Sequence, residues 1–130
     1  MAHEEAKKIA KARDNYRCVI CGKHKSEVER YDGAHFADVS VYPILADFPH
    51  NIFGMCDHCH GLFDRIPNQK QRKRTPAEKI TWIYANVPYP RVNDMIMQIH
   101  RLKCEVDALI EAGRFCGYKL IDWGNNGAQK

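Results

Sequence analysis

The chain contains the Cys-x-x-Cys motif twice, at Cys18–Cys21 and at Cys56–Cys59. Each motif can form a tight turn that directs two thiolates at one ion. Gly22 suits the turn after the first pair because glycine tolerates a positive φ. Two such turns supply the four sulfur ligands of a tetrahedral Zn²⁺ site. We therefore predict a structural zinc ion bound by Cys18, Cys21, Cys56 and Cys59.

Two other interpretations of these motifs are a thioredoxin-like redox pair and a set of reduced thiols in a hydrophobic core. A redox pair would follow a strand in a βαβ unit, and the pattern offers no such unit. The remaining cysteines, Cys104 and Cys116, have no partner at ligand spacing, so we expect buried thiols that pack as small hydrophobic residues. A metal would add folding free energy to a segment of about 60 residues, which buries little apolar surface by itself.

Length and composition limit the classes of protein to which the chain can belong. Its 130 residues suit one domain, or one small domain with a helical extension. A content of 45% hydrophobic and 28% charged residues is typical of an ordered globular chain. No apolar run approaches the roughly 20 residues of a membrane span. Residues 1–17 lack the apolar core of a secretory signal, so we expect no membrane association and a cytoplasmic location.

Local signals predict an α+β fold. In residues 3–13 acidic side chains precede basic ones, which complements a helix dipole. Thr75, Pro76 and Glu78 have the types and spacing of a helix start with a capping box. The predicted helices are 3–13, a short one from about 60 that ends before Pro67, one from 76 to near Pro88, and 93–112 with Gly113 after its end; the predicted strands are 31–36 and 51–55.

The last predicted helix carries apolar residues at alternating steps of three and four: Val92, Met95, Ile99, Leu102, Val106 and Leu109. This seam has two interpretations. It can pack against the preceding helix, or it can form a homodimer through the C-terminal helix. We divide the chain into a zinc-stabilised core with its N-terminal helix at 1–68, and a basic linker with a C-terminal helical extension at 69–130.

Three residues that can perform chemistry occur in a fixed order around the second cysteine motif. His35 lies in Asp-Gly-Ala-His-Phe, Asn51 opens the segment that leads to Cys56, and His60 directly follows Cys59. This order resembles the zinc-bearing members of the HNH endonuclease family. The segment around His35 is also similar to phage Rap-type recombination nucleases, in which the usual order is Asp-Ala-Gly-His-Phe. The resemblance covers about residues 13–64.

The resemblance implies a ββα-metal (His-Me finger) core and assigns roles to these residues. His35 would be the general base, because a neutral imidazole accepts a proton near neutral pH. His60 would bind a catalytic divalent metal, Mg²⁺ or Mn²⁺, which stabilises the charge that develops on the phosphate and the leaving oxygen. Asn51 would orient His35 through its side-chain amide and brace the hairpin.

The catalytic metal site departs from the family pattern at one position. Many members carry an Asp or His immediately before the general base, and this chain has Ala34 there. Asp32, which shares a strand face with Ala34, is one candidate to replace that ligand. Asp64 is another, because it lies one helical turn after His60 on the same face. Alternatively, His60, water and the substrate phosphate hold the ion.

Positive charge is concentrated after the proposed core. The chain carries a net charge of +4. Residues 65–74 contain five basic residues and no acidic one: Arg65, Lys70, Arg72, Lys73 and Arg74. Such a run is either a solvated linker or a set of contacts to DNA phosphates. Beside a phosphodiesterase site we favour the second interpretation. With no base-reading helix evident, we expect weak sequence preference.

These observations predict a divalent-metal-dependent DNA endonuclease that leaves 5′-phosphate and 3′-hydroxyl ends, in a bacterial or phage-infected cell. A phage recombination nuclease that acts on branched DNA is a narrower version of the same prediction. A non-catalytic zinc-containing module that binds DNA through the basic run is the alternative from another class. A second alternative is a zinc-clasped scaffold that binds a protein partner through its C-terminal helices.

Overall fold

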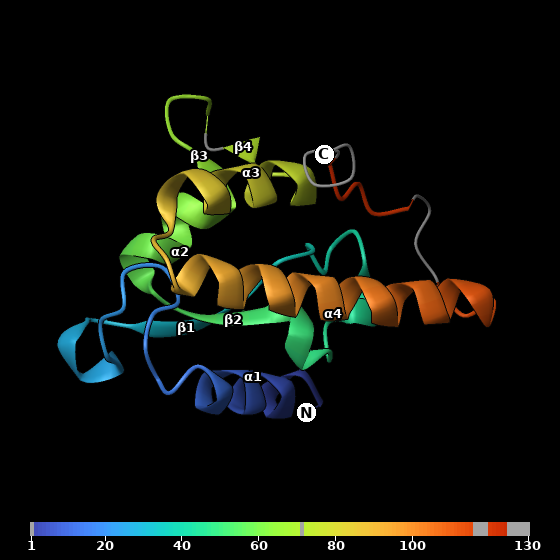
Figure 1. The fold of residues 1–130 in the computed structure, drawn as a ribbon, viewed down its shortest axis with the longest axis horizontal. Helices are drawn as coiled ribbons and strands as arrows, with labels where there is room; N and C mark the ends of the chain where they lie inside the picture. Colours follow the sequence, from blue (N-terminus) through green and yellow to red (C-terminus); the bar gives the residue numbers. More distant parts are fainter. Residues whose placement is uncertain (1, 71, 116–119, 125–130) are drawn as a thin grey trace.

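A computed structural model describes residues 2–70, 72–115 and 120–124 and has an α+β fold, as predicted (Figure 1). The helices are α1 (Ala2–Arg13), α2 (Asp57–Asp64), α3 (Pro76–Asn86) and α4 (Arg91–Glu111). The strands are β1 (Tyr31–His35), β2 (Ile52–Cys56), β3 (Arg65–Ile66) and β4 (Arg72–Lys73). Within the described residues, no helix combines the length and the apolar character needed to cross a membrane.

Strands β1 and β2 form an antiparallel hairpin, with His35 opposite Ile52 and Tyr31 opposite Cys56. Helix α2 begins at the residue after β2, so the hairpin and α2 are continuous. A small residue is required at Gly54, because a Cβ atom there would overlap the hydroxyl group of Tyr31. That hydroxyl donates a hydrogen bond to the Arg17 carbonyl oxygen at 2.9 Å, which ties the hairpin to the first cysteine motif.

Helix α1 lies against the hairpin on the side away from α3 (Figure 1). Its Ala6 and Ala10 are buried together with Ile52 of β2. At its last residue, the Arg13 guanidinium donates to the carbonyl oxygens of Pro49 and Ile52 at 2.9 and 2.6 Å. The predicted N-terminal helix therefore fixes the position at which β2 begins.

The two segments into which we divided the sequence share one hydrophobic core. Phe53 of β2, Phe63 of α2 and Leu102 of α4 belong to the same buried cluster. Four of the predicted seam residues on α4 are buried in the chain itself: Met95, Ile99, Leu102 and Val106. Packing within the chain, the plainer of our two interpretations, accounts for this seam. The homodimer stays a prediction, but the seam no longer supports it, because its residues are buried within the chain.

Helix boundaries follow the local signals closely. Thr75 caps α3 by accepting a hydrogen bond from the Glu78 N–H, and the Glu78 carboxylate accepts one from the Thr75 N–H, so the predicted capping box is confirmed. Gly113 follows α4 with φ of +70°, as expected of a glycine after a helix end.

Two details differ from the sequence predictions. The basic segment is a short β3–β4 hairpin rather than an irregular linker, and its turn uses positive φ angles at Asn68 and Lys70. Cys104 is exposed rather than buried, because it lies on α4 outside the apolar seam. The other unpaired cysteine, Cys116, lies outside the described residues.

Candidate functional site

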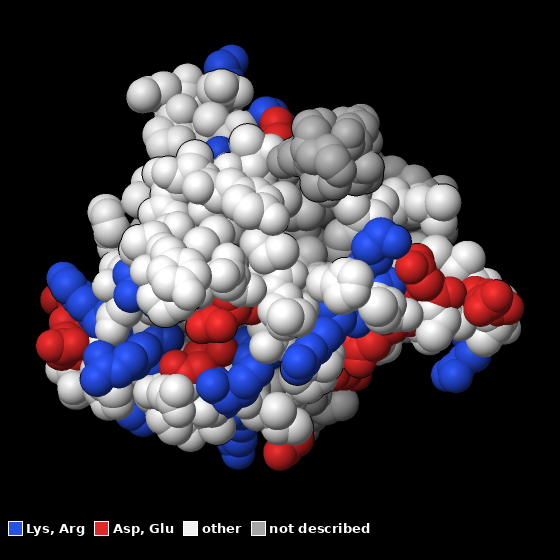
Figure 2. Space-filling model, in the orientation of Figure 1, with Lys and Arg blue, Asp and Glu red and all other residues white. Residues whose placement is uncertain are grey.

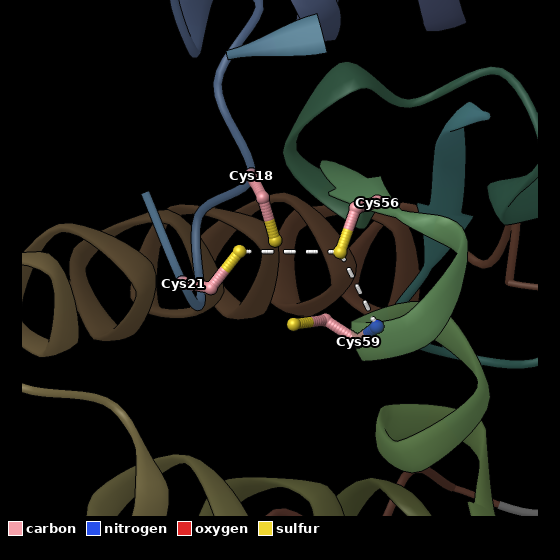
Figure 3. Close-up of side chains that lie close together, drawn as sticks. All are labelled: Cys18, Cys21, Cys56 and Cys59. Carbon is pink, nitrogen blue, oxygen red and sulfur yellow. Dashed lines mark hydrogen bonds between the residues drawn. The ribbon is translucent and has the colours of Figure 1, made fainter. Parts of the chain in front are cut away.

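The four motif cysteines come together in one cluster (Figure 3). Their sulfur atoms all lie within 4.8 Å of one another, and the Sγ atoms of Cys21 and Cys56 are 3.9 Å apart. A tetrahedron with Zn–S bonds of about 2.3 Å has edges of about 3.8 Å, so this spacing suits one shared ion. The cluster can hold a metal such as zinc.

Backbone contacts explain why these cysteines face one another. Gly22 has φ of +84° and donates its N–H to the Cys18 carbonyl oxygen at 2.9 Å, which closes the first turn. The Val19 N–H bonds to the Gly54 carbonyl oxygen at 2.9 Å and so joins that turn to β2. Cys56 is the N-cap of α2, where its sulfur accepts from the Cys59 N–H at 3.4 Å.

Burial raises the pKa of the Cys59 thiol, and the nearby Cys18 raises it further. Four thiolates would repel one another at these distances unless a cation neutralised them. Metal binding deprotonates cysteine ligands and couples that loss of protons to folding. A cation at the centre of the cluster would neutralise the thiolates and so allow all four to be deprotonated together.

His35 lies at the end of β1 and is half-buried. Its Nε2 is 3.2 Å from the carbonyl oxygen of Ala46. Because a carbonyl oxygen only accepts hydrogen bonds, Nε2 is the protonated nitrogen in this contact. The basic lone pair of the neutral ring is therefore on Nδ1, as a general base needs.

Asn51 lies directly before β2 and is completely buried. Its amide oxygen accepts the Ala37 N–H at 2.7 Å, and its NH₂ group donates to the carbonyl oxygens of Ala37 and Leu45 at 3.2 and 3.1 Å. These three bonds all go to backbone groups, and the orientation of His35 by Asn51 stays a prediction. The bracing role agrees with the structure, since Asn51 holds together the loop that carries Ala46.

Asn51→Ala should destabilise the protein by about 3 kcal/mol, because it leaves buried backbone groups without partners at about 1–3 kcal/mol each. Urea denaturation followed by circular dichroism measures the change. Asn86→Ala is the matched control, because Asn86 is exposed and its single hydrogen bond, to the Trp82 carbonyl oxygen, lies at the surface. Equal losses in the two variants would contradict the bracing role.

His60 lies between two carboxylates. Its Nδ1 donates to Asp32 Oδ2 at 2.8 Å, and its Nε2 is 3.0 Å from Asp64 Oδ2. Arg30 in turn donates to both oxygens of Asp32, at 2.9 and 3.1 Å. Asp32 and Asp64 therefore contact opposite nitrogens of one ring. Among the described residues, a set of three or more candidate metal ligands with their ligand atoms close together is found at the cysteine cluster and not at His60.

These contacts shift the pKa values of the three groups in a consistent direction. The hydrogen bond to Asp64 raises the pKa of His60 against the effect of burial, and Asp32 adds to the increase. Burial alone would raise the pKa of Asp64, but His60 and Lys79 lower it overall. The pKa of Asp32 is lowered in the same way, against burial, by Arg30 and His60. Each carboxylate is therefore held in its charged form.

A small cavity of about 130 Å³ joins His35 to the end of α2. Its polar lining consists of His35, Asp38, Asp64, Lys73, Arg74 and Lys79. The predicted base and one predicted metal ligand thus share a cavity with three cationic side chains. A concave site with convergent charged groups of both signs is suited to a phosphate and a cation.

Sequence reasoning missed two charged residues of this cavity, Asp38 and Lys79, of which Lys79 on α3 is the buried one. Burial lowers its pKa, and Asp64 opposes that change. The sequence carried a signal, because Lys79 is adjacent to Ile80 and one turn before Ile83, on the apolar face of α3. A lysine within an apolar stripe is unusual, and its ammonium needs a partner in the core.

Two of the predicted DNA-binding residues, Lys73 and Arg74, line this cavity, and three of the five have partners within the chain. Arg72 bonds to Glu78 at 2.8 Å and Lys73 to Asp38 at 3.0 Å. The half-buried Arg74 donates to the Leu62 carbonyl oxygen at 3.1 Å and lies 5.5 Å from the centre of the Trp82 ring. The last two residues of the set, Arg65 and Lys70, are exposed.

Basic residues also gather elsewhere. On the face shown in Figure 2, Lys and Arg side chains lie mainly in the lower half, over α1 and α4, with acidic side chains between them. A larger cavity of about 600 Å³ between these helices is lined by arginines that include Arg13, Arg91 and Arg101, and by Asp14 and Asp94. It contains none of the predicted catalytic residues. Positive charge is therefore less confined to the basic run than we expected.

Comparisons with family models, curated proteins and solved structures found no match to this chain.

Proposed function

We propose that the protein is a divalent-metal-dependent DNA endonuclease, with a ββα-metal core of the HNH type that a structural zinc ion stabilises. The observation that supports this most directly is the cavity that His35 and Asp64 share with Lys73, Arg74 and Lys79. It combines an imidazole, a carboxylate and two cations that can contact a phosphate, Lys73 and Arg74, which are the kinds of group that phosphodiester hydrolysis requires.

In this proposal His35 accepts the proton of the attacking water at Nδ1. The Ala46 carbonyl oxygen holds Nε2–H, so it fixes the ring and stabilises the imidazolium that forms. Asn51 contributes indirectly, because it braces the loop that carries this carbonyl group. Lys73, which is paired with Asp38, and Arg74, which bonds to the Leu62 carbonyl oxygen, line the same cavity and would contact the phosphate beside the cleaved bond.

The metal ligands in this proposal are His60 Nε2 and Asp64 Oδ2, which are 3.0 Å apart. A nitrogen and a carboxylate oxygen leave most positions for water and phosphate, as Mg²⁺ and Mn²⁺ prefer. A bound ion would stabilise the charge that develops on the phosphate and the leaving 3′ oxygen. Asp32 then acts behind His60 rather than as a ligand: a carboxylate on Nδ1–H fixes the ring so that Nε2 can ligate.

Neutralising Arg72 and Lys73 together, as Arg72→Gln and Lys73→Gln, should weaken DNA binding and reduce its dependence on salt. Each lost phosphate contact lowers the slope of log K against log salt by about 0.9. Fluorescence anisotropy with labelled duplex DNA at several salt concentrations measures the slope. Lys103→Gln is the matched control, since Lys103 is paired with Asp107 on α4. An unchanged slope in the double variant would favour the other interpretation, in which the basic segment is solvated and does not contact DNA.

Cleavage assays on supercoiled plasmid, linear duplex, branched and single-stranded DNA, with Mg²⁺ or Mn²⁺, test the proposed function. We expect cleavage of at least one substrate, with 3′-hydroxyl ends that a polymerase extends. Binding to DNA without cleavage under either ion would support the non-catalytic DNA-binding module instead. The change to Ala34 would then mark the loss of a ligand for the catalytic metal.

A further inference from the structure

Lys79 is buried in an unusual way. The residue is 4% exposed, and the other buried polar residue in the described part of the chain is the neutral Asn51. Lysines at protein surfaces normally extend their stems so that the ammonium reaches water. Lys79 instead directs its ammonium inward, where burial of a charge is costly unless several partners compensate.

The partners of Lys79 come from two separate elements of the hairpin–helix unit. Its Nζ donates to the carbonyl oxygens of His35 and Phe36, at 3.0 and 2.8 Å. It also lies 3.5 Å from Oδ1 of Asp64 and 4.8 Å from the centre of the Phe63 ring. Two contacts are therefore at the end of β1, and the other two are at the end of α2.

These contacts connect the groups of the proposed site into one continuous network. Asp64 meets Lys79 through Oδ1 and His60 through Oδ2, and His60 meets Asp32 through its other nitrogen. Lys79 thus links the backbone of His35 to the carboxylate of Asp64. An apolar side chain of equal length could fill the same space, but it could not bind both the His35 carbonyl oxygen and the Asp64 carboxylate.

We propose that Lys79 is a positioning residue of the site: its ammonium sets the separation of His35 and Asp64. This inference rests on the proposed function for its effect on catalysis. It also makes α3, in the predicted C-terminal extension, part of the catalytic apparatus. A displacement of about 1 Å between reacting groups can cost about 100-fold in rate, which sets the size of effect expected.

Lys79→Met tests this inference, because methionine fills the volume of the lysine stem and lacks the ammonium. We expect kcat for DNA cleavage to fall about 100-fold with KM for DNA unchanged. Lys103→Met, on the exposed face of α4, is the matched control and should cleave at the wild-type rate. A Lys79→Met protein that folds and cleaves at the wild-type rate would overturn the proposal.

Lys79→Ala provides a second variant with a measurement that a merely structural role would not change. Ethylammonium can enter the space left by the shortened side chain, and we expect it to restore cleavage at least tenfold, whereas ethanol should not. If Lys79→Ala folds but ethylammonium and ethanol act alike, the ammonium is not what positions the site. Folding of either variant, checked by circular dichroism and zinc content, is sufficient for the test.

A readout without DNA separates this inference from the proposed function. Imidazole ¹H–¹⁵N resonances of zinc-loaded protein, recorded with no other divalent ion, report the surroundings of His35 and His60. Both should shift in Lys79→Met and stay in place in Lys103→Met. If the wild-type protein cleaves no DNA but these resonances shift, the proposed function fails and the positioning role survives. Resonances that are identical in all three proteins would refute the positioning role.

Discussion

His35→Ala should lower the rate of DNA cleavage by about 10²–10⁴-fold, the range typical for loss of a general base. The variant should keep its fold and its affinity for DNA. The half-buried ring makes a hydrogen bond to one backbone carbonyl group and is not part of the buried core cluster. Single-turnover cleavage of supercoiled plasmid, with zinc-loaded protein in excess, measures the chemical step directly.

The matched control for this prediction is His100→Ala. His100 is exposed on α4, where its Nε2 makes a weak contact to the Cys104 sulfur at 3.8 Å. We expect wild-type cleavage from this variant. A His35→Ala protein that cleaves as fast as His100→Ala would remove His35 from the mechanism, while DNA cleavage by wild type would still support a nuclease.

Cys59→Ser should abolish stoichiometric zinc binding and leave the chain unfolded at 25 °C. Structural zinc contributes an apparent 10–16 kcal/mol or so in small zinc-binding peptides, which matches or exceeds the total stability of about 5–15 kcal/mol of most domains. Cys59 is 5% exposed, and its cluster joins the first cysteine turn to the junction of β2 and α2. Zinc content by mass spectrometry and thermal unfolding by circular dichroism measure both effects.

Cys104→Ser controls for the loss of a thiol at a position away from the cluster, because Cys104 is exposed on α4. It should bind one zinc ion per chain and unfold at the wild-type temperature. Should Cys59→Ser lose its zinc yet unfold at that same temperature, the cluster would not be what stabilises the fold.

The sequence predicted best those features that local chemistry determines. The two Cys-x-x-Cys motifs lie far apart in sequence, but the ligand chemistry that they share predicted that the four sulfurs lie together, and they do. Thr75 and Glu78 form a capping box because the spacing alone permits it. The predicted proximity of His60 and Asp64 follows from one helical turn, and the two side chains meet at 3.0 Å.

Most contacts between distant segments could not be predicted from the sequence. The hydrogen bonds of Asn51 to Ala37 and Leu45 depend on how the loop between β1 and β2 folds. Asp32 meets His60 only because the hairpin places β1 beside the start of α2. The role of Lys79 required the packing of α3 against both β1 and α2. Each of these contacts spans a gap in sequence that no periodic pattern describes.

The most direct test of the central claim is nicking of supercoiled plasmid by zinc-loaded wild-type protein as Mn²⁺ or Mg²⁺ is added. The protein should be prepared without a chelator, so that zinc remains in the cysteine cluster. We predict no nicking before the addition, and nicking that rises with the concentration of the added ion and then saturates. Plasmid that remains supercoiled at every concentration of both ions, with protein that is folded and carries zinc, would contradict the proposal that this fold is a nuclease.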